Sequence, residues 1–369
     1  MGKGRSIKAI REFDSTDIGD TRLLIIEVEF QDSSKDLYTI VEDESRIGNI
    51  LEEAFADGAS SSIFHGKQGY FVFKNRGRIP TKYFRTLKPI STEQSNSAYF
   101  NPGKIFFKLF RRLQEGAHPE AEILEQLNEK NFSSTPRLYG SCVYRNENGH
   151  CYTLGIIEEH LTGYSNVWEY FNKQMDANAA KVLGIETARM HQALKGLDGV
   201  PSKGEDVPFQ KLKDLLNVSS DGAKKNSEIL QALPHIEQAF NQALLAQKKA
   251  ESNSQIFVPQ RIHGDFHLGQ ILIGEKGGEM NVAPTFKILD FEGEPTRSIE
   301  FRRALRSPAV DIAGMLRSFR YAAANSGLNS QTVEEAFIEG YSQESGVAEA
   351  SLKYAAAPYL LAKAVYEAC

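Results

Sequence analysis

The segment 261–295 limits what this chain can fold into and do more than any other part of the sequence. It contains the tripeptide His-Gly-Asp ending at Asp265, then Gln270 five positions later, and an apolar run that ends at Asp290. Protein kinases use a similar pattern, H-R-D-x-x-x-x-N followed by D-F-G, in which one carboxylate orients the attacking hydroxyl while an amide and a second carboxylate bind magnesium. The pattern therefore predicts a site for phosphoryl transfer, with Asp265 as the catalytic residue that contacts the acceptor hydroxyl and Gln270 and Asp290 as metal ligands.

Two short apolar runs predict how these residues come together. Residues 270–273 and 285–289 are rich in branched side chains and a glycine pair lies between them, so they predict two strands of a hairpin-like pair. Such a pair brings Gln270 close to Asp290. A buried loop with satisfied carboxylates is the alternative, because Gly and Asp are common in turns. The spacing of all three polar residues favours the functional interpretation.

A cation for the nucleotide phosphates is expected on an earlier strand. A β-prone run contains Lys108, and a lysine in apolar surroundings is costly unless it meets an anion. A helix is predicted over 120–130, with Glu120 and Glu122 in its first turn, where acidic side chains suit the helix dipole. Either glutamate is a candidate partner of Lys108. Lys104 is the competing cation because we expect it on the same strand face, and an exposed edge-strand lysine is the other alternative.

A short polar segment between two β-like stretches is the candidate phosphate-covering loop. It contains Ser95, Asn96 and Ser97, whose hydroxyl, amide and backbone groups are suitable donors for phosphate oxygens. The chain contains no G-x-G-x-x-G and no G-x-x-x-x-G-K-[ST] segment. On its own, this loop is therefore a weak indication.

An apolar strand that ends in polar residues is predicted over 155–161. This pattern is typical of the hinge between the two lobes of a kinase. We expect backbone groups around Glu158 to His160 to bind the edge of the adenine base.

Acidic and basic residues follow Asp290 closely. Glu292 and Glu294 are candidate ligands for metal, sugar hydroxyls or an ammonium group, and ion pairing with an arginine such as Arg302 is the slightly favoured alternative. Residues 308–321 then predict an amphipathic helix. Asp311, near its start, is expected to brace the catalytic loop rather than take part in the chemistry.

Several sequence blocks resemble the bacterial maltokinases, which are relatives of the aminoglycoside phosphotransferases. These blocks keep their order and are EQSNS (93–97), KLFRRLQEGAHPEAEIL (108–124), PRLYG (136–140), HGDFHLGQIL (263–272), ILDFEGEP (288–295) and FRRALRSPAVDIAGMLRSFRYAA (301–323). The last block is specific to this group and its near relatives, since general protein kinases do not contain it.

The resemblance implies an α+β, bilobal, protein-kinase-like fold with an N-terminal α+β cap domain. The expected divisions are a cap over 1–88, a nucleotide-binding N-lobe with the hinge over 89–162, and a mostly helical C-lobe over 163–369, with helices at 211–216 and 226–249. The resemblance further implies ATP and Mg²⁺ as cofactors and maltose as the sugar substrate, phosphorylated at its anomeric hydroxyl to maltose 1-phosphate. Association with trehalose synthase or another glucan-pathway enzyme is also implied.

Two alternatives to maltokinase activity stay open. Glucosamine kinases share the same core, and in that branch a C-terminal glutamate, followed 11 places later by a tryptophan, is associated with sugar binding. Glu367 matches the glutamate and, with Glu292, is a candidate substrate residue, whereas the sequence ends at Cys369 before the tryptophan. The other alternative is a non-catalytic nucleotide-binding partner of a glucan-synthesis enzyme. The presence of Lys108, Asp265, Gln270 and Asp290 argues against it.

Composition limits the remaining possibilities. The 369 residues have a net charge of −5, which gives no electrostatic footprint for nucleic acid. The three cysteines, Cys142, Cys151 and Cys369, make no metal or disulfide framework and are expected as free thiols in the cytoplasm. We expect neither a signal peptide nor a membrane-spanning segment.

Overall fold

The computed structural model describes residues 5–56, 60–76, 81–90, 96–202, 258–274 and 283–368, with isolated positions between 234 and 245. The predicted helix 211–216 and most of the predicted helix 226–249 lie outside these described residues. The chain forms two compact units. Unit 1 comprises Met1–Asn128 and Pro136–Gly163, and unit 2 comprises Glu129–Thr135 and Tyr164–Cys369.

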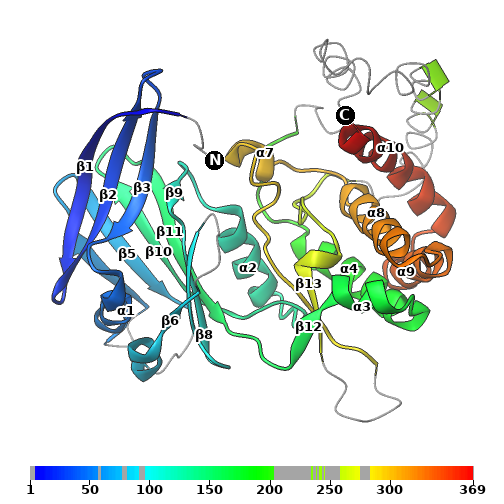
Figure 1. Cartoon of the computed structure of the whole chain (residues 1–369), viewed down its shortest axis with the longest axis horizontal. Helices are drawn as coiled ribbons and strands as arrows, with labels where there is room; N and C mark the ends of the chain where they lie inside the picture. Colours follow the sequence, from blue (N-terminus) through cyan, green and yellow to red (C-terminus); the bar gives the residue numbers. More distant parts are fainter. Residues whose placement is uncertain are drawn as a thin grey trace. The chain divides into compact units, whose positions relative to one another are not determined.

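The first sheet of unit 1 is antiparallel (Figure 1). Its order is β1-β2-β3-β9, with β1 at Ile7–Ile18, β2 at Thr21–Phe30, β3 at Lys35–Val41 and β9 at Arg112–Leu113. Strands β1, β2 and β3 form a meander, and β9 pairs with β3. A two-residue turn joins β1 to β2, and Gly19 in it has a φ of +61°, which glycine adopts without steric cost. Buried and partly exposed residues alternate through most of β2, so one face of this sheet packs on the interior.

The second sheet of unit 1 contains seven strands. Their order is β4-β5-β10-β11-β8-β7-β6, with bounds Ser61–His65, Gly69–Asn75, Leu138–Asn146, Cys151–Glu159, Ile105–Leu109, Ser97–Asn101 and Lys88–Pro89 respectively. Strands from both sides of residue 88 therefore belong to one sheet, and β9 joins the first sheet to the later part of the unit. The division into a cap and an N-lobe at residue 88 stays a prediction.

Helices and aromatic side chains complete the core of unit 1. Helix α1 (Ile47–Ala54) buries an apolar face; the 3-10 segment η1 (Glu44–Arg46) directly precedes it, and the 3-10 segment η2 (Thr81–Thr86) packs against it. Phe55 packs between Phe73 and Phe84, with ring centroids 6.0 and 5.7 Å away. Helix α2 (Pro119–Glu129) buries Ile123, Leu124 and Leu127, as its apolar spacing predicts.

A buried carboxylate ties parts of both sheets of unit 1 together. Asp14 of β1 is fully buried and accepts hydrogen bonds from the backbone N–H groups of Lys67 (2.6 Å) and Gln68 (3.1 Å), in the β4–β5 turn. It also accepts one from the Tyr144 hydroxyl of β10 at 2.7 Å. Burial and this hydrogen bond to Asp14 raise the pKa of Tyr144, so the phenol stays a donor.

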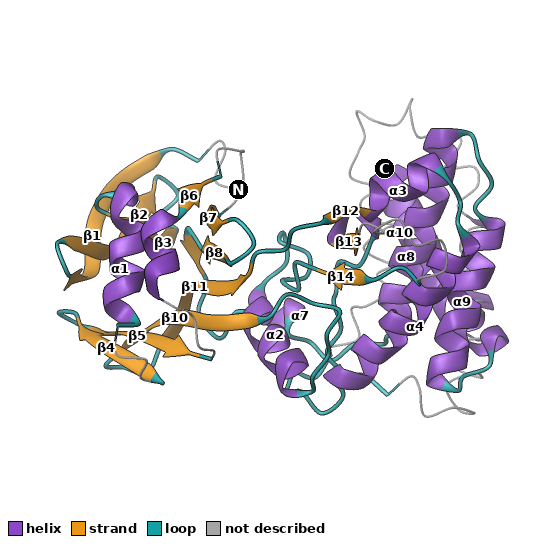
Figure 2. Cartoon of the chain, turned by 90° about the horizontal axis from the view of Figure 1, so that it is seen from below, coloured by secondary structure: helices purple, strands orange, loops and turns teal. Residues whose placement is uncertain are grey.

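Unit 2 is mostly helical, with a small sheet. The sheet has the order β12-β13-β14, with bounds Tyr164–Asn166, Ile271–Gly274 and Phe286–Ile288. The helices are α3 (Val167–Lys173), α4 (Ala177–Leu194), α7 (Ile299–Arg302), α8 (Ala309–Ser326), α9 (Gln331–Ser345) and α10 (Glu349–Ala368). The predicted amphipathic helix 308–321 is thus confirmed as part of α8. The small sheet lies at one side of helices α3, α4, α8, α9 and α10 (Figure 2). Among the described residues, no helix combines the length and apolarity that crossing a membrane needs.

Two glycines allow α4 and α9 to approach closely. A Cβ atom added at Gly184 of α4 would overlap the backbone carbonyl oxygen of Phe337, and one added at Gly340 of α9 would overlap that of Lys181. The backbones therefore meet without side chains between them. This contact aligns α9, and with it Tyr341, against α4.

Gly184→Ala tests the close α4–α9 contact. In a free helix the change stabilises by about 0.5–1 kcal/mol, whereas overpacking here costs about 1–3 kcal/mol. We therefore expect a lower melting temperature, measured by circular dichroism. The control Ala324→Gly, at an exposed position of α8, reports helix propensity alone. An unchanged or raised melting temperature for Gly184→Ala would contradict the packing described.

Candidate functional site

The loop that precedes β13 is fixed by a buried imidazole. His263 is 1% exposed, and its Nε2 donates a hydrogen bond to the Leu289 carbonyl oxygen at 2.8 Å. Its Nδ1 accepts from the backbone N–H of Asp265 at 3.4 Å. These two bonds require the neutral tautomer with the proton on Nε2. His263 thereby connects the backbone of the candidate catalytic residue to the end of β14.

A second brace comes from Asp311 in the first turn of α8. Its carboxylate accepts hydrogen bonds from the backbone N–H groups of His263 at 2.8 Å and Gly264 at 3.0 Å. His191 Nε2 of α4 lies 3.0 Å from the same carboxylate, and His191 Nδ1 lies 3.0 Å from the Tyr341 hydroxyl of α9. Because the carboxylate can only accept, His191 donates through Nε2 and its Nδ1 accepts from Tyr341. The predicted bracing role of Asp311 is confirmed.

The sequence interpretation missed His191 and Tyr341. Both are almost fully buried, at 2% and 3% exposure, and lie 120 and 30 positions from Asp311 along the chain. The only local signal for His191 is a lone histidine on the mostly small and apolar buried face of α4. That signal does not identify a partner, because the contact is made only when α4, α8 and α9 pack together.

The Asp311 carboxyl is ionised despite its burial. Burial by itself raises a carboxyl pKa, but the hydrogen bond from His191, the electrostatic attraction of the His191 and His263 imidazoles and the hydrogen bond from the Gly264 N–H outweigh this and hold the pKa of Asp311 below its ordinary value. A charged acceptor strengthens all three hydrogen bonds to the loop and to α4. Its ionisation is therefore part of what holds the loop in place.

The strand pair β13–β14 brings the two predicted metal ligands together. Ile271 pairs with Ile288, and the Leu289 N–H donates to the Gln270 carbonyl oxygen at 2.9 Å, directly before Asp290. The predicted hairpin-like pair is confirmed. An amide oxygen and a carboxylate are suitable ligands for Mg²⁺, which also keeps waters and substrate phosphates in its shell. The ligand roles of Gln270 and Asp290 stay predictions.

Backbone strain marks the same position. Asp290 has a φ of +54°, one of three non-glycine residues with positive φ among those the structure describes. This conformation costs on the order of 1–2 kcal/mol in an L-residue. Phe291, which is fully buried and lies 4.9 Å from the His263 ring, holds the chain there. Strain retained next to a braced loop is typical of a functional position.

The acidic residues after Asp290 are engaged by arginines. The Arg302 side chain is 4% exposed, donates to the Glu292 carbonyl oxygen at 3.0 Å, and lies 3.6 Å from the Glu292 carboxylate. Gly293 has a φ of +69°, which glycine adopts without steric cost, and the stem of Arg302 lies beside it. Glu294 pairs with Arg297 at 3.0 Å. The predicted ion pairing of Glu292 with Arg302 is confirmed, and its role toward substrate stays a prediction.

In unit 1, the candidate phosphate-binding lysine has a defined partner. Lys108 Nζ of β8 lies 2.9 and 3.2 Å from the two carboxylate oxygens of Glu120, in the first turn of α2. Their side chains are 11% and 2% exposed. The observed partner among the two candidates is thus Glu120, while Glu122, two residues later, lies about 200° around the helix from it.

Lys104 was expected on the same strand face as Lys108, and this expectation is wrong. Strand β8 begins at Ile105, so Lys104 lies in the turn that precedes it. Its ammonium lies 5.4 Å from the centroid of the Tyr83 ring, which suits a cation–π contact. The physical reason is that residues 102–104 form the turn between β7 and β8, so the strand begins later than the β-prone run predicted.

The described part of the candidate phosphate loop leads directly into β7 of the seven-stranded sheet. Ser97 begins β7 and pairs with Leu109, and the Asn96 carbonyl oxygen accepts a hydrogen bond from Arg111 at 3.0 Å. Ser95 lies outside the described residues. Asn96 and Ser97 thus lie beside the strand that contains Lys108.

The hinge prediction concerns the end of β11. Glu158 pairs with Phe106 of β8 in the sheet, and the His160 N–H donates to the Lys104 carbonyl oxygen at 3.4 Å. The His160 ring stacks on Phe100 at 5.0 Å, and its Nδ1 accepts from the Gly103 N–H at 3.1 Å. Burial lowers the pKa of His160 and so favours this neutral acceptor. Adenine contacts at Glu158 and His160 stay predictions.

Glu367 lies in the last turn of α10, and its side chain is outside the described part of the structure. Its role toward substrate therefore stays a prediction.

Comparisons with known proteins show which family this chain resembles. The family model described as "Phosphotransferase enzyme family" matches residues 86–282. A glucosamine kinase of Mycolicibacterium smegmatis is 24% identical over 75% of this chain and 68% of its own length. One of Streptacidiphilus jiangxiensis is 25% identical over 55% of this chain, and the match spans 46%, about half, of that relative.

The solved structures confirm the predicted fold. A glucosamine kinase in complex with glucosamine, ADP and inorganic phosphate has a TM-score of 0.70 and 19% sequence identity, and the match covers 98% of this chain and 89% of that one. A second glucosamine kinase crystal form gives a TM-score of 0.71 at 18% identity. At these identities the similarity shows the fold alone.

Lys108→Ala tests the buried ion pair of unit 1. Removing one partner of such a pair typically costs about 3–5 kcal/mol, because the other charge stays buried. We expect a clear loss of stability in chemical denaturation, with a matched Lys104→Ala control within about 0.5 kcal/mol of the parent. The double variant Lys108→Met/Glu120→Leu should recover much of the loss. Equal effects of Lys108→Ala and Lys104→Ala would rule out a dominant buried pair.

Asp311→Asn tests the brace of the catalytic loop. The amide replaces an ionised acceptor, and losing charge-assisted hydrogen bonds costs about 1.5–3 kcal/mol. The pKa of Asp311 is lower in the folded than in the unfolded protein. Its ionised carboxylate therefore stabilises the folded state fully above the ordinary carboxyl pKa of about 3.9, and this stabilisation is lost as pH falls through the folded-state pKa. The stability gap between parent and variant should therefore narrow in that acidic range. A gap independent of pH, or one matched by the exposed control Glu349→Gln, would contradict this account.

Proposed function

Since the chain belongs to the phosphotransferase enzyme family, we propose that it is an ATP-dependent kinase that phosphorylates a hydroxyl group of a sugar. The observation that supports this most is the brace on the 262–267 loop, in which Asp311 and His263 hold the backbone around Asp265. A preorganised carboxylate is what transfer to a hydroxyl needs, because catalysis of phosphoryl transfer consists mainly of positioning and charge stabilisation.

In this proposal Asp265 orients the acceptor hydroxyl and accepts its proton. The acceptor oxygen forms a bond to the γ-phosphorus of ATP, the bond from that phosphorus to the β,γ-bridging oxygen breaks, and ADP leaves. Lys108, held by Glu120, is proposed to bind the nucleotide phosphates. Asn96 and Ser97, with Ser95, are proposed to donate hydrogen bonds to the same phosphates.

Gln270 and Asp290 are proposed to hold Mg²⁺. When bound there, the ion would neutralise negative charge on the transferring phosphate. The chain's own contribution is to keep an amide and a carboxylate oxygen at the same end of the β13–β14 pair. The Arg302–Glu292 contacts support this arrangement, because they anchor the backbone two residues after Asp290.

Glucosamine is the acceptor that we propose first, because the relatives and solved structures similar over most of this chain are named glucosamine kinases. Maltose is the second candidate. It rests on the resemblance of blocks such as 93–97 and 301–323 to the maltokinases. Glu292 and Glu367 are the residues proposed to contact the sugar, and Glu292 would do so while paired with Arg302.

Two further predictions accompany this proposal. Association with trehalose synthase or another glucan-pathway enzyme is proposed from the maltokinase resemblance alone. A non-catalytic nucleotide-binding role is the competing function, and the complete set of Lys108, Asp265, Gln270 and Asp290 argues against it.

Asp265→Asn tests the proposed function. The change keeps the shape of the side chain and removes the base, so we expect sugar-dependent ADP release to fall by at least about 10²-fold, within the usual contribution of general-base catalysis. Nucleotide affinity, measured by isothermal titration calorimetry, should stay within a few-fold of the parent. The control Asp198→Asn makes the same change at an exposed aspartate of unit 2 and should retain activity. Near-normal turnover in Asp265→Asn would reject the assigned role.

A further inference from the structure

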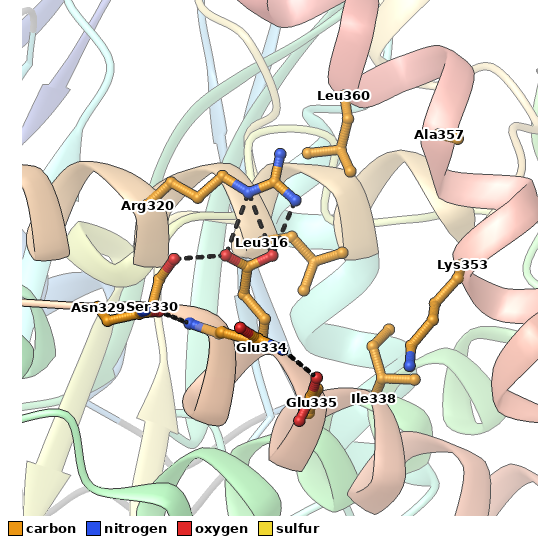
Figure 3. Close-up of a pocket in the computed structure, with 11 residues that line it drawn as sticks. Leu316, Arg320, Asn329, Ser330, Glu334, Glu335, Ile338, Lys353, Ala357 and Leu360 are labelled. Carbon is orange, nitrogen blue, oxygen red and sulfur yellow. Dashed lines mark hydrogen bonds and ion pairs between the residues drawn. The ribbon is translucent and has the colours of Figure 1, made fainter.

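Unit 2 contains a pocket that the proposed reaction does not use. It has a volume of about 530 Å³ and lies between α8, α9 and α10 (Figure 3). Its lining consists of Leu316 and Arg320 from α8, Asn329 and Ser330 before α9, Gln331, Glu334, Glu335 and Ile338 from α9, and Lys353, Ala357 and Leu360 from α10. This volume is within the range of about 300–1,000 Å³ that is usual for small-molecule sites.

One side of the pocket is a preorganised polar network. Arg320 donates three hydrogen bonds to the Glu334 carboxylate, at 2.8 to 3.1 Å, and the Ser330 hydroxyl donates to the same carboxylate at 2.6 Å. Figure 3 shows these groups converging at the wall formed by α8 and the start of α9. The Glu334 side chain is mostly buried, at 16% exposure, whereas the Arg320 side chain is 49% exposed and so accessible to a ligand in the pocket.

The other polar groups come from facing elements. Gln331 donates to the Glu335 carboxylate at 3.0 Å, and Lys353 of α10, 50% exposed, lies 3.7 Å from Glu349 outside the lining. The lining contains two cations, Arg320 and Lys353, and two anions, Glu334 and Glu335, so its formal charge is zero. A pocket of this kind has no electrostatic preference for an anion such as a nucleotide.

The floor of the pocket is apolar. Leu316 and Ile338 are 4% and 1% exposed, and the half-buried Ala357 and Leu360 complete this surface from α10. The aliphatic side chains are thus surrounded by polar groups of three kinds. Carboxylates accept hydrogen bonds, cationic groups donate them, and amides do both. A sugar ring has the matching chemistry, because its hydroxyls both donate and accept while its C–H faces are apolar.

Helical periodicity separates this pocket from the catalytic loop. Asp311 contacts the loop, and Ser318, seven residues later and about two turns along α8, accepts a hydrogen bond from the Leu268 N–H at 3.1 Å. Arg320 is nine residues from Asp311, which places it roughly opposite on the helix. One face of α8 therefore braces the loop, and the opposite face lines the pocket.

We propose that this pocket is an accessory binding site for a neutral saccharide, separate from the acceptor site at Asp265. The neutral lining, the mixed donors and acceptors and the aliphatic floor are the observations that support it. A saccharide bound there would contact α8 on the face opposite to the one that holds the catalytic loop. The site does not depend on the chain being a kinase.

Hydrogen exchange of the full chain, read by mass spectrometry, tests this proposal directly. Maltose and glucose are the neutral probes, and inorganic phosphate is the anionic probe. We expect a neutral probe to slow exchange in peptides covering 329–338 and 353–360. Ala357→Trp fills the pocket from α10 and should raise the saccharide concentration for half-maximal protection at least about tenfold, which corresponds to about 1.4 kcal/mol.

Two control variants change residues outside the pocket lining. Ala324→Trp adds the same side chain at an exposed position of α8 outside the lining, and Tyr354→Ala changes the exposed neighbour of Lys353. Both should leave the half-maximal concentration unchanged. Should Ala357→Trp fail to fold, Lys353→Ala at a half-exposed position replaces it, and we expect it to weaken protection about three- to tenfold through one lost hydrogen bond to a charged donor.

Three results would overturn the accessory site. These are no protection of 329–338 by either saccharide, protection by phosphate alone, and equal losses in Ala357→Trp and Ala324→Trp. Protection of 262–268 reports the proposed acceptor site and is expected to persist in Ala357→Trp. If the protein shows no kinase activity but a saccharide still protects the pocket, the proposed function is rejected and the accessory site is not. If the protein shows kinase activity but no saccharide protects the pocket, only the accessory site is rejected.

Discussion

The ionised carboxylate of Asp311 is the interaction on which the candidate site depends. It accepts hydrogen bonds from two backbone N–H groups of the 263–264 turn and from the His191 imidazole, and so joins α4, α8 and the 262–267 loop at one buried point. Burial opposes its charge, and the donors around it overcome this opposition. A loop held by charge-assisted hydrogen bonds from the core stays in place without help from the substrate, which is the preorganisation that catalysis of phosphoryl transfer requires.

Packing around this point explains features that have no chemical role of their own. The glycine contact between α4 and α9 brings Tyr341 to His191, and the Tyr341 hydroxyl selects the imidazole tautomer that donates to Asp311. On the other side of the loop, Phe291 and Arg302 hold the strained backbone at Asp290. Unit 1 also contains a buried charge held by an opposite charge, since Glu120 fixes the position of the Lys108 ammonium group.

Much of this could be predicted from local sequence. The His-Gly-Asp turn, the β13–β14 pair and the helix after Pro308 follow from short patterns of glycine, branched and apolar residues. Other features require tertiary information. Nothing local distinguishes Glu120 from Glu122 as the partner of Lys108, because strand and helix register decide it. Strand β1 was not predicted, because its exposed and charged first half does not alternate between apolar and polar residues. His191 is identified only by a contact 120 positions away.

The most direct measurement of the central claim is transfer of the γ-phosphate from ATP to a defined acceptor. Purified protein with Mg²⁺ would be incubated with glucosamine, maltose, glucose or no sugar, and the phosphorylated product followed by ³¹P nuclear magnetic resonance. The account predicts a new sugar-phosphate signal with glucosamine, or with maltose if the second candidate is correct, and ADP formation that requires the sugar. Nucleotide binding without product from any of these sugars would contradict it and favour the non-catalytic role.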